Sequence, residues 1–383
     1  MTSISTAPPL TPGRLEQFST RIAFFIAGFS IAAWAPLVPY AKARIGLDEG
    51  TLGLLLLCLG VGSIIAMPLA GALAARFGCR RVLAASTVLV CLCLPLLATV
   101  SSLPLMVATL FVFGASMGAL DCTVNIQAII VERASGKTMM SGFHGLFSVG
   151  GFVGAASVAG MLSLGASPLI AMLVVAVFCF IALLKAAPHL LSYGSATRGP
   201  AFAVPRGIVL FIGLLCFTVF LTEGAMLDWS AVFLSAQRGV ETSYAGLGYA
   251  VFATTMTIGR LFGDPIVRRL GAQRIVLVGG LCASAGLALA TLVPTWEAAL
   301  LGYALVGAGC SNIVPVCYSA VGRQKTMPEN VAVPAITTLG YGGILVGPAG
   351  IGFVAHASSL DLAFMIIAVM LLGVAVSGRF LKG

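Results

Sequence analysis

Apolar segments of bilayer length constrain the fold of this chain more than any other feature. Six lie at about 18–42, 50–75, 81–100, 104–131, 139–165 and 168–186, and six more at about 207–236, 243–269, 274–293, 297–324, 330–356 and 361–380. A helix of about 20 apolar residues crosses a hydrocarbon core of roughly 30 Å. Only 9% of the residues are charged and the mean hydropathy is +1.08, which excludes a soluble domain of this length. The sequence therefore predicts an all-α membrane protein with twelve transmembrane helices.

One polar stretch, residues 188–206, divides the twelve segments into six and six. The stretch is rich in Gly, Pro and Ser, which is typical of a linker. We therefore expect an N-terminal tail over residues 1–17 and a six-helix bundle over 18–187. The linker and a second six-helix bundle over 207–383 then follow.

The two halves repeat one another at a constant offset of 193 residues. The offset pairs Gly53 with Gly246, Gly78 with Gly271, Gly114 with Gly307, Gly150 with Gly343 and Gly154 with Gly347. A single pair could arise by chance in a Gly-rich chain, but the offset holds along the whole half. It predicts two bundles related by pseudo-symmetry. The last two pairs form Gly-xxx-Gly spacings, which favour close helix packing in lipid.

The basic residues indicate the orientation in the membrane. Of the 21 Lys and Arg, all but Lys42, Arg44 and Arg238 fall on one side of the predicted helices. The positive-inside rule then places both termini in the cytoplasm. Although the net charge is +9, the basic residues are scattered between apolar segments, so we predict a lipid bilayer and no nucleic acid as partner.

Asp121 is an acid inside a segment that otherwise suits lipid. A charged side chain at the bilayer centre costs at least about 2.5 kcal/mol on insertion scales, so this carboxylate should face protein or a water-filled cavity. Asn125 follows one helical turn later and projects from the same face. We expect both to bind substrate and Asp121 to couple transport to protons, while a buried structural acid remains the alternative.

Polar and aromatic residues on three other segments complete the expected site. Glu223 lies about sixteen residues into its segment, near mid-membrane, and is the second candidate for proton coupling and substrate binding. Asp228, Trp34 and Asn312 are further candidates for substrate contact. A structural role for Glu223, a solvent-facing Asp228 and a core or interface role for Trp34 remain open.

The sequence contains no pattern typical of an enzyme or a cofactor site. The ten cysteines include no CxxC pair, and the three histidines have no metal-site spacing, so we predict no metal and no cofactor. The run ERASGKT ends like a phosphate-binding loop, but Val131 stands where that motif requires its first glycine. A membrane enzyme is therefore disfavoured.

The loop between the second and third segments, GALAARFGCRRVL, resembles the signature loop of the major facilitator superfamily. The matching positions are Gly71, Arg76, Gly78, Arg80 and Arg81. Ala75 departs from the pattern, because the family usually has Asp there. A looser second copy, GRLFGDPIVRRLG, contains Arg260 and Asp264 one turn apart, near the inner end of its segment. The resemblance implies that Arg76, Arg260 and Asp264 act as gating residues that latch the cytoplasmic side.

Within the superfamily, the chain looks most like the fucose-permease-like branch and its uncharacterised bacterial relatives. The features that carry this resemblance are Asp121 with Asn125, SGFHGLFSVGGFVGA from Ser141, and EGAMLDWSAVF from Glu223. The fold implied is two six-helix bundles, with spans one, four, seven and ten around a central cavity. The second acid of the fucose permease has no counterpart near Ala35.

Together these features predict a secondary active transporter of the bacterial inner membrane, working by alternating access and coupled to protons. No Lys or Arg is expected at mid-membrane, which favours a small neutral polar or cationic substrate, because a buried anion needs a compensating cation. We expect a monomer that is not an enzyme. A multidrug-type exporter and a non-transporting membrane sensor in the same fold are the alternatives.

Overall fold

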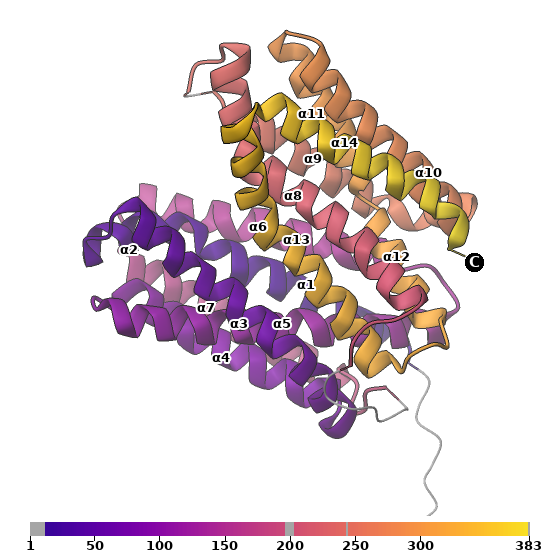
Figure 1. The fold of residues 1–383 in the computed structure, drawn as a ribbon. Helices are drawn as coiled ribbons and strands as arrows, with labels where there is room; N and C mark the ends of the chain where they lie inside the picture. The colour runs from indigo at the N-terminus through magenta and orange to yellow at the C-terminus, as the bar shows by residue number, and fades with distance from the viewer. Residues whose placement is uncertain (1–11, 196–202, 243, 382–383) are drawn as a thin grey trace, which may run out of the picture.

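The computed structural model describes residues 12–195, 203–242 and 244–381, and all regular structure within them is helical. The all-α expectation therefore holds for this part of the chain (Figure 1). Residues 1–11 of the predicted tail and 196–202 of the predicted linker lie outside the described residues. In chain order the helices are α1 (Arg14–Ala33), η1 (Ala35–Leu37), α2 (Val38–Ile45), α3 (Glu49–Phe77), α4 (Cys79–Thr99), α5 (Leu103–Ser135), α6 (Met140–Ser163), α7 (Pro168–Ala186), η2 (Ala187–His189), α8 (Ile208–Arg238), α9 (Leu247–Leu261), α10 (Gly263–Leu292), α11 (Trp296–Cys310), α12 (Ile313–Arg323), α13 (Glu329–Ala357), α14 (Leu360–Ser377) and η3 (Gly378–Phe380).

Within the described residues, 11 helical stretches are long and apolar enough to cross a membrane, one fewer than predicted. The count differs at the predicted segment 243–269, because the helix breaks at Phe262 and leaves α9 with only 15 residues. Phe262 nevertheless keeps near-helical angles (φ −95°, ψ 7°), so residues 263–270, which form the first part of α10, continue the helix of α9. Gly271 (φ 79°, ψ 161°) then divides α10 into two helices. Gly78, its partner at the offset of 193, has almost the same conformation (φ 85°, ψ 156°) and separates α3 from α4.

The predicted repeat is also visible in helix packing. A Cβ atom added to Gly114 would lie 2.0 Å from the carbonyl oxygen of Leu59, and one added to Gly307 would lie 2.2 Å from that of Phe252. The two contacted residues are themselves 193 positions apart. Each glycine thus permits the same close helix approach in its own half, which confirms the pairing inferred from the sequence.

The two Gly-xxx-Gly spacings bring helices into close contact, as predicted. A Cβ atom on Gly150 would lie 2.3 Å from the carbonyl oxygen of Phe25 on α1, and one on Gly154 would lie 2.3 Å from that of Phe29. On α13, Gly343 approaches the carbonyl oxygen of Phe217 on α8 equally closely, at 2.3 Å. Larger side chains at these positions would force the helices apart.

The helices form two groups, α1–α7 and α8–α14, which are named here the first and the second group. Figure 1 shows the first in indigo to magenta and the second in rose through orange to yellow. Across the boundary, α3 contacts α13, α6 contacts α9, and α5 and α6 contact α12. Buried apolar residues fill the interior of both groups.

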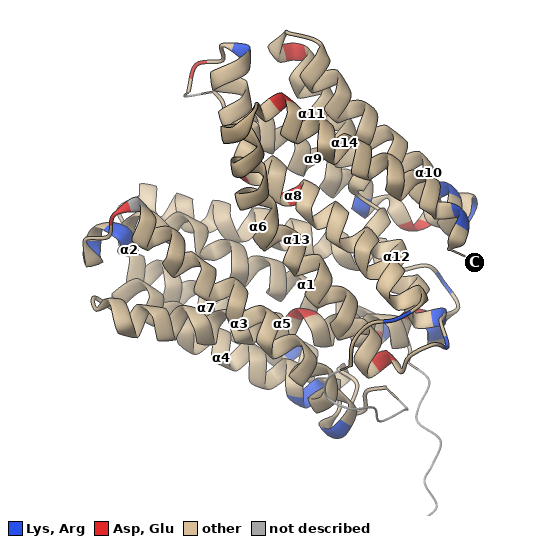
Figure 2. Ribbon diagram, in the orientation of Figure 1, with Lys and Arg blue, Asp and Glu red and all other residues tan. Residues whose placement is uncertain are grey.

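The helix ends also differ in charge. One end of the helices, where α1 begins and α3, α5 and α7 end, is named here the basic end. The opposite end, near Asp48 and Arg238, is named the far end. Lys and Arg residues, coloured blue on the ribbon of Figure 2, gather at the basic end, with few at the far end.

The two arginines at the far end have structural roles. Arg44 donates three hydrogen bonds of 2.7–2.9 Å to carbonyl oxygens at the end of α4. Arg238 donates two, of 2.7 and 2.8 Å, to carbonyl oxygens near the end of α10. A cation is favourable at a helix C-terminus, where carbonyl groups lack partners within the helix. These arginines thus cap equivalent helices in the two groups.

Candidate functional site

Asp121 lies in the middle of α5, with Asn125 on the same helix face as predicted. The side-chain amide of Asn125 donates a 2.9 Å hydrogen bond to the backbone carbonyl oxygen of Asp121 and lies 3.4 Å from its Oδ1 atom. Asn125 is 1% exposed, and its Oδ1 atom has no hydrogen-bond partner. A buried acceptor without a partner is unfavourable, so this atom is available to a bound molecule.

Tyr341 of α13 reaches Asp121 from the second group. Its hydroxyl group lies beside the Asp121 carboxyl group. Among the described residues, no Lys or Arg forms an ion pair with Asp121. The acid at the centre of the first group therefore faces a neutral phenol of the second group, and its charge has no compensating cation.

Glu223 of α8 is also tied across the boundary, but through an arginine. The Arg260 Nη2 atom lies 2.9 Å from Glu223 Oε1, while Nη1 donates a 3.0 Å hydrogen bond to Ser148 Oγ on α6 of the first group. Arg260 Nε donates to the carbonyl oxygen of Ser311 at 3.3 Å. Arg260 is 5% exposed and the Glu223 side chain 21%, so this is a largely buried ion pair.

Ser148 and Tyr341 are themselves separated by the repeat offset of 193 residues. Each reaches from its own group to the charged site of the other group. Neither residue was predicted from the sequence, although the repeat offset pairs them once one is placed at the site.

The position of Arg260 corrects two expectations. First, Arg260 pairs with Glu223, whereas the predicted partner Asp264 accepts hydrogen bonds from the backbone N–H groups of Ser141 (3.0 Å) and Gly142 (3.1 Å) at the start of α6. Second, a cation does lie at mid-membrane, because Glu223 is the sixteenth residue of the 31 in α8. Because residues 263–270 continue the helix after Phe262, Arg260 is the fourteenth of the 24 residues 247–270 and lies in the middle of this span.

The contacts that close the basic end come mainly from residues that were not predicted. Glu132 accepts a hydrogen bond from Ser319 of α12, and Arg133 forms an ion pair with Glu329 of α13. Of the predicted gating residues, Asp264 joins the two groups here and Arg260 joins them at mid-membrane. Arg76 is exposed and lies over the ring of Phe77 at 5.0 Å, with no hydrogen bond or ion pair to the second group among the described residues.

Trp34 is buried closer to the far end than the acids are. Ser30 of α1 contacts Met117 of α5 at 3.6 Å. Trp34 lies one turn from Ser30 toward the far end, and Asp121 lies one turn from Met117 toward the basic end, so about 12 Å separates them along the helix axes. Trp34 is 5% exposed, and its Nε1–H has no acceptor. It is a free donor, but it does not touch Asp121.

Asp228 and Asn312 also lie apart from the two acids. Asp228 is exposed, on the far-end side of Glu223, and has no hydrogen bond or ion pair among the described residues. The Asn312 amide donates to the Gly259 carbonyl oxygen at 3.0 Å and to Ser311 Oγ at 2.9 Å, at the break between α11 and α12. The Oδ1 atom of Asn312 is buried without a partner.

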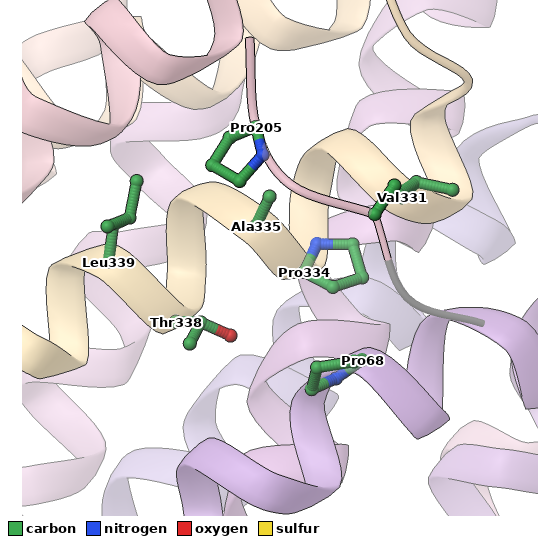
Figure 3. Close-up of a pocket in the computed structure, with 8 residues that line it drawn as sticks. Pro68, Pro205, Val331, Pro334, Ala335, Thr338 and Leu339 are labelled. Carbon is green, nitrogen blue, oxygen red and sulfur yellow. The ribbon is translucent and has the colours of Figure 1, made fainter. Parts of the chain in front are cut away.

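A small cavity of about 120 Å³ lies on the boundary between α3 and α13 (Figure 3). Its lining comprises Pro68, Ala203, Pro205, Val331, Pro334, Ala335, Thr338 and Leu339. None of these side chains is charged, and neither Asp121 nor Glu223 is among them, so this cavity is not a candidate for proton coupling. Among the described residues, no cluster of His, Cys, Asp or Glu could hold a metal ion.

Comparison with known proteins decides the family. Residues 21–333 match the sequence model described as Major Facilitator Superfamily. The chain belongs to the major facilitator superfamily. It is 55% identical over 369 residues to an uncharacterized MFS-type transporter of Yersinia pestis, with 96% of each chain covered. It is 31% identical over 370 residues to the membrane protein MosC of Rhizobium meliloti, covering 93% of this chain and 88% of that one.

Solved structures of this superfamily share the fold. The E. coli fucose:proton symporter FucP superposes with a TM-score of 0.79 at 15% identity, covering 96% of this chain and 98% of that chain. A human organic anion transporter gives a TM-score of 0.74 at 15% identity, with 96% and 99% covered. At these identities the likeness establishes the fold alone. The predicted resemblance to the superfamily and its fucose permease is confirmed at that level.

Proposed function

We propose that this protein is a secondary active transporter that moves a small neutral polar or cationic solute across the bacterial inner membrane, coupled to protons. The observation that carries the proposal is that each group holds a mid-membrane acid connected to the other group. Asp121 lies beside Tyr341, and Glu223 is linked to Ser148 through Arg260. An acid at this depth is energetically costly, so acids inside membrane helices usually have a function. These two lie where relative movement of the groups would change their partners.

The architecture proposed for transport has twelve spans in two six-helix bundles, over 18–187 and 207–383, joined by a linker over 188–206. Counting residues 247–270 as the eighth span, and the part of α10 after Gly271 as the ninth, restores twelve. With the basic end in the cytoplasm, both termini are cytoplasmic.

The conformation fits an outward-open state under this orientation. Every cross-group hydrogen bond named above lies at mid-membrane or at the basic end, where Arg133 binds Glu329 and Asp264 caps α6. The two groups diverge toward the far end in Figure 1. A solute from the far side would then meet Trp34 and Asp228 before reaching Asp121 and Glu223.

The charges at the site support the substrate class. Arg260 is compensated by Glu223, so the ion pair contributes no net charge, whereas Asp121 has no cation. A neutral polar or cationic solute can use the Asp121 carboxylate and the free Oδ1 atom of Asn125 as acceptors. An anion would meet uncompensated negative charge at Asp121.

Protonation provides the coupling in this proposal. A proton on Asp121 removes the charge that attracts a cation or a hydroxyl group. A proton on Glu223 removes the counter-charge of Arg260, which would weaken its fixed position between α8 and α6. Either event changes the free-energy difference between the two conformations of the transporter.

Two steps test the function. The purified protein is first screened by thermal shift against sugars, polyols, amines and drugs, because a ligand that binds only the folded state raises the melting temperature. Proteoliposomes are then assayed for uptake of each stabilising compound under an imposed pH difference. Accumulation of one sugar, polyol or amine is expected. Accumulation of many unrelated cationic drugs would favour a multidrug exporter, and binding without transport of any compound would favour a sensor.

A further inference from the structure

A groove of about 440 Å³ runs along the lipid-facing side of the first group, between α4 and α5 beside the end of α3. Small residues, including Ala85, Ala115 and Ala119, line part of it. The larger side chains of Phe77 and Leu89, both exposed, also line it. In a membrane, this apolar groove faces acyl chains instead of water.

Arg81 gives the groove a charged end. It lines the groove as the third residue of α4, is exposed, and makes no hydrogen bond or ion pair among the described residues. Its neighbour Arg80 is already occupied, donating to the carbonyl oxygens of Leu190 at 2.9 Å and Pro188 at 2.5 Å. The cavity in Figure 3 has no basic residue in its lining, so the two hollows differ in the charge they offer.

The groove is long enough for part of one acyl chain. Arg81 and Leu89 are eight residues apart, which corresponds to about 12 Å along α4. The groove thus extends from the basic end, where Figure 2 shows Lys and Arg gathered, toward the middle of the membrane. An arginine binds a phosphate group through several N–H donors, and the apolar groove accommodates a chain below it.

We propose that this groove binds an anionic phospholipid of the leaflet at the basic end, with one acyl chain between α4 and α5 and the headgroup phosphate on Arg81. A zwitterionic lipid with the same chains fits the groove but carries no net negative charge. One basic residue near an anionic membrane surface corresponds to about a fivefold preference. The site does not depend on the identity of the transported solute or on the direction of transport.

Native mass spectrometry of the full-length protein in detergent tests the site, with phosphatidylglycerol and phosphatidylcholine of identical chains as probes. We expect one tightly bound phosphatidylglycerol, preferred about fivefold, and loss of that preference in Arg81→Gln. Ala115→Phe should fill the groove and reduce binding of both lipids. Arg268→Gln is the matched control, since Arg268 is also exposed near the basic end but lines neither cavity described above.

Two results would overturn the proposal. The first is an unchanged lipid preference in Arg81→Gln together with unchanged binding in Ala115→Phe. The second is an equal loss of preference in Arg268→Gln, which would assign the effect to general surface charge.

Discussion

Replacing Glu223 with glutamine isolates the contribution of the buried ion pair. The substitution keeps the size and hydrogen-bonding capacity of the side chain but removes the counter-charge 2.9 Å from Arg260. Arg260 is 5% exposed, and its other contacts, Ser148 Oγ and the Ser311 carbonyl oxygen, are neutral. The guanidinium would therefore remain buried without a compensating charge.

The expected loss of stability follows from this geometry. Removing one partner of a buried ion pair destabilises a protein by about 3–5 kcal/mol. The Glu223 side chain is 21% exposed, so water offsets part of the loss and the lower limit, about 3 kcal/mol, applies. With roughly 2 °C per kcal/mol for a large domain, the apparent melting temperature should fall by about 6 °C.

A double-mutant cycle in detergent provides the assay. Tryptophan fluorescence follows thermal unfolding of the wild type, Glu223→Gln, Arg260→Gln and the double variant, all at one scan rate because unfolding can be irreversible. The double variant has no unpaired charge and should be more stable than either single variant. Single variants as stable as the wild type, or simple additivity in the double variant, would refute the assignment of a stabilising ion pair.

Three shorter tests address the latch, the topology and the caps. Asp264→Asn should weaken closure of the basic end and raise labelling of a cysteine introduced there. The control variant Asp361→Asn, at the far end, should not raise this labelling. Equal labelling in the wild type and both variants would leave Asp264 with a folding role only. A reporter fused within the linker 188–206 should indicate the cytoplasm and one inserted near Asp48 the periplasm, and a periplasmic linker would contradict the six-plus-six arrangement. Arg44→Gln should destabilise the protein by about 1–2 kcal/mol through lost charge-assisted hydrogen bonds at the end of α4, and an unchanged melting temperature would show that water replaces them.

The helical class and the repeat could be predicted from the sequence because they depend on local patterns. Length and hydropathy identify a membrane helix without knowledge of its neighbours. The glycine pairs are visible because close helix approach requires a missing Cβ atom, as at Gly114 and Gly307. The facing of Asp121 and Asn125 follows from helix geometry alone.

The partners of the acids could not be predicted, because they depend on how the two groups are placed together. Tyr341 reaches Asp121 from a helix more than 200 residues away in sequence. Arg260 was misplaced because its spacing from Asp264 suggested a local ion pair, whereas its partners come from α6 and α8. The ion pair of Arg133 with Glu329 at the basic end likewise joins two charged residues that cannot be told from ordinary loop residues in the sequence.

Transport by Asp121→Asn in proteoliposomes tests the central claim most directly. The variant keeps the shape and the hydrogen-bonding capacity of the side chain, but it cannot exchange a proton. For a compound that stabilises the wild type in the thermal-shift screen, we predict that Asp121→Asn still exchanges labelled for unlabelled solute across the membrane. It should not accumulate solute under an imposed pH difference, whereas the wild type should. Accumulation by Asp121→Asn equal to that of the wild type would contradict proton coupling through this residue and reduce Asp121 to a structural acid.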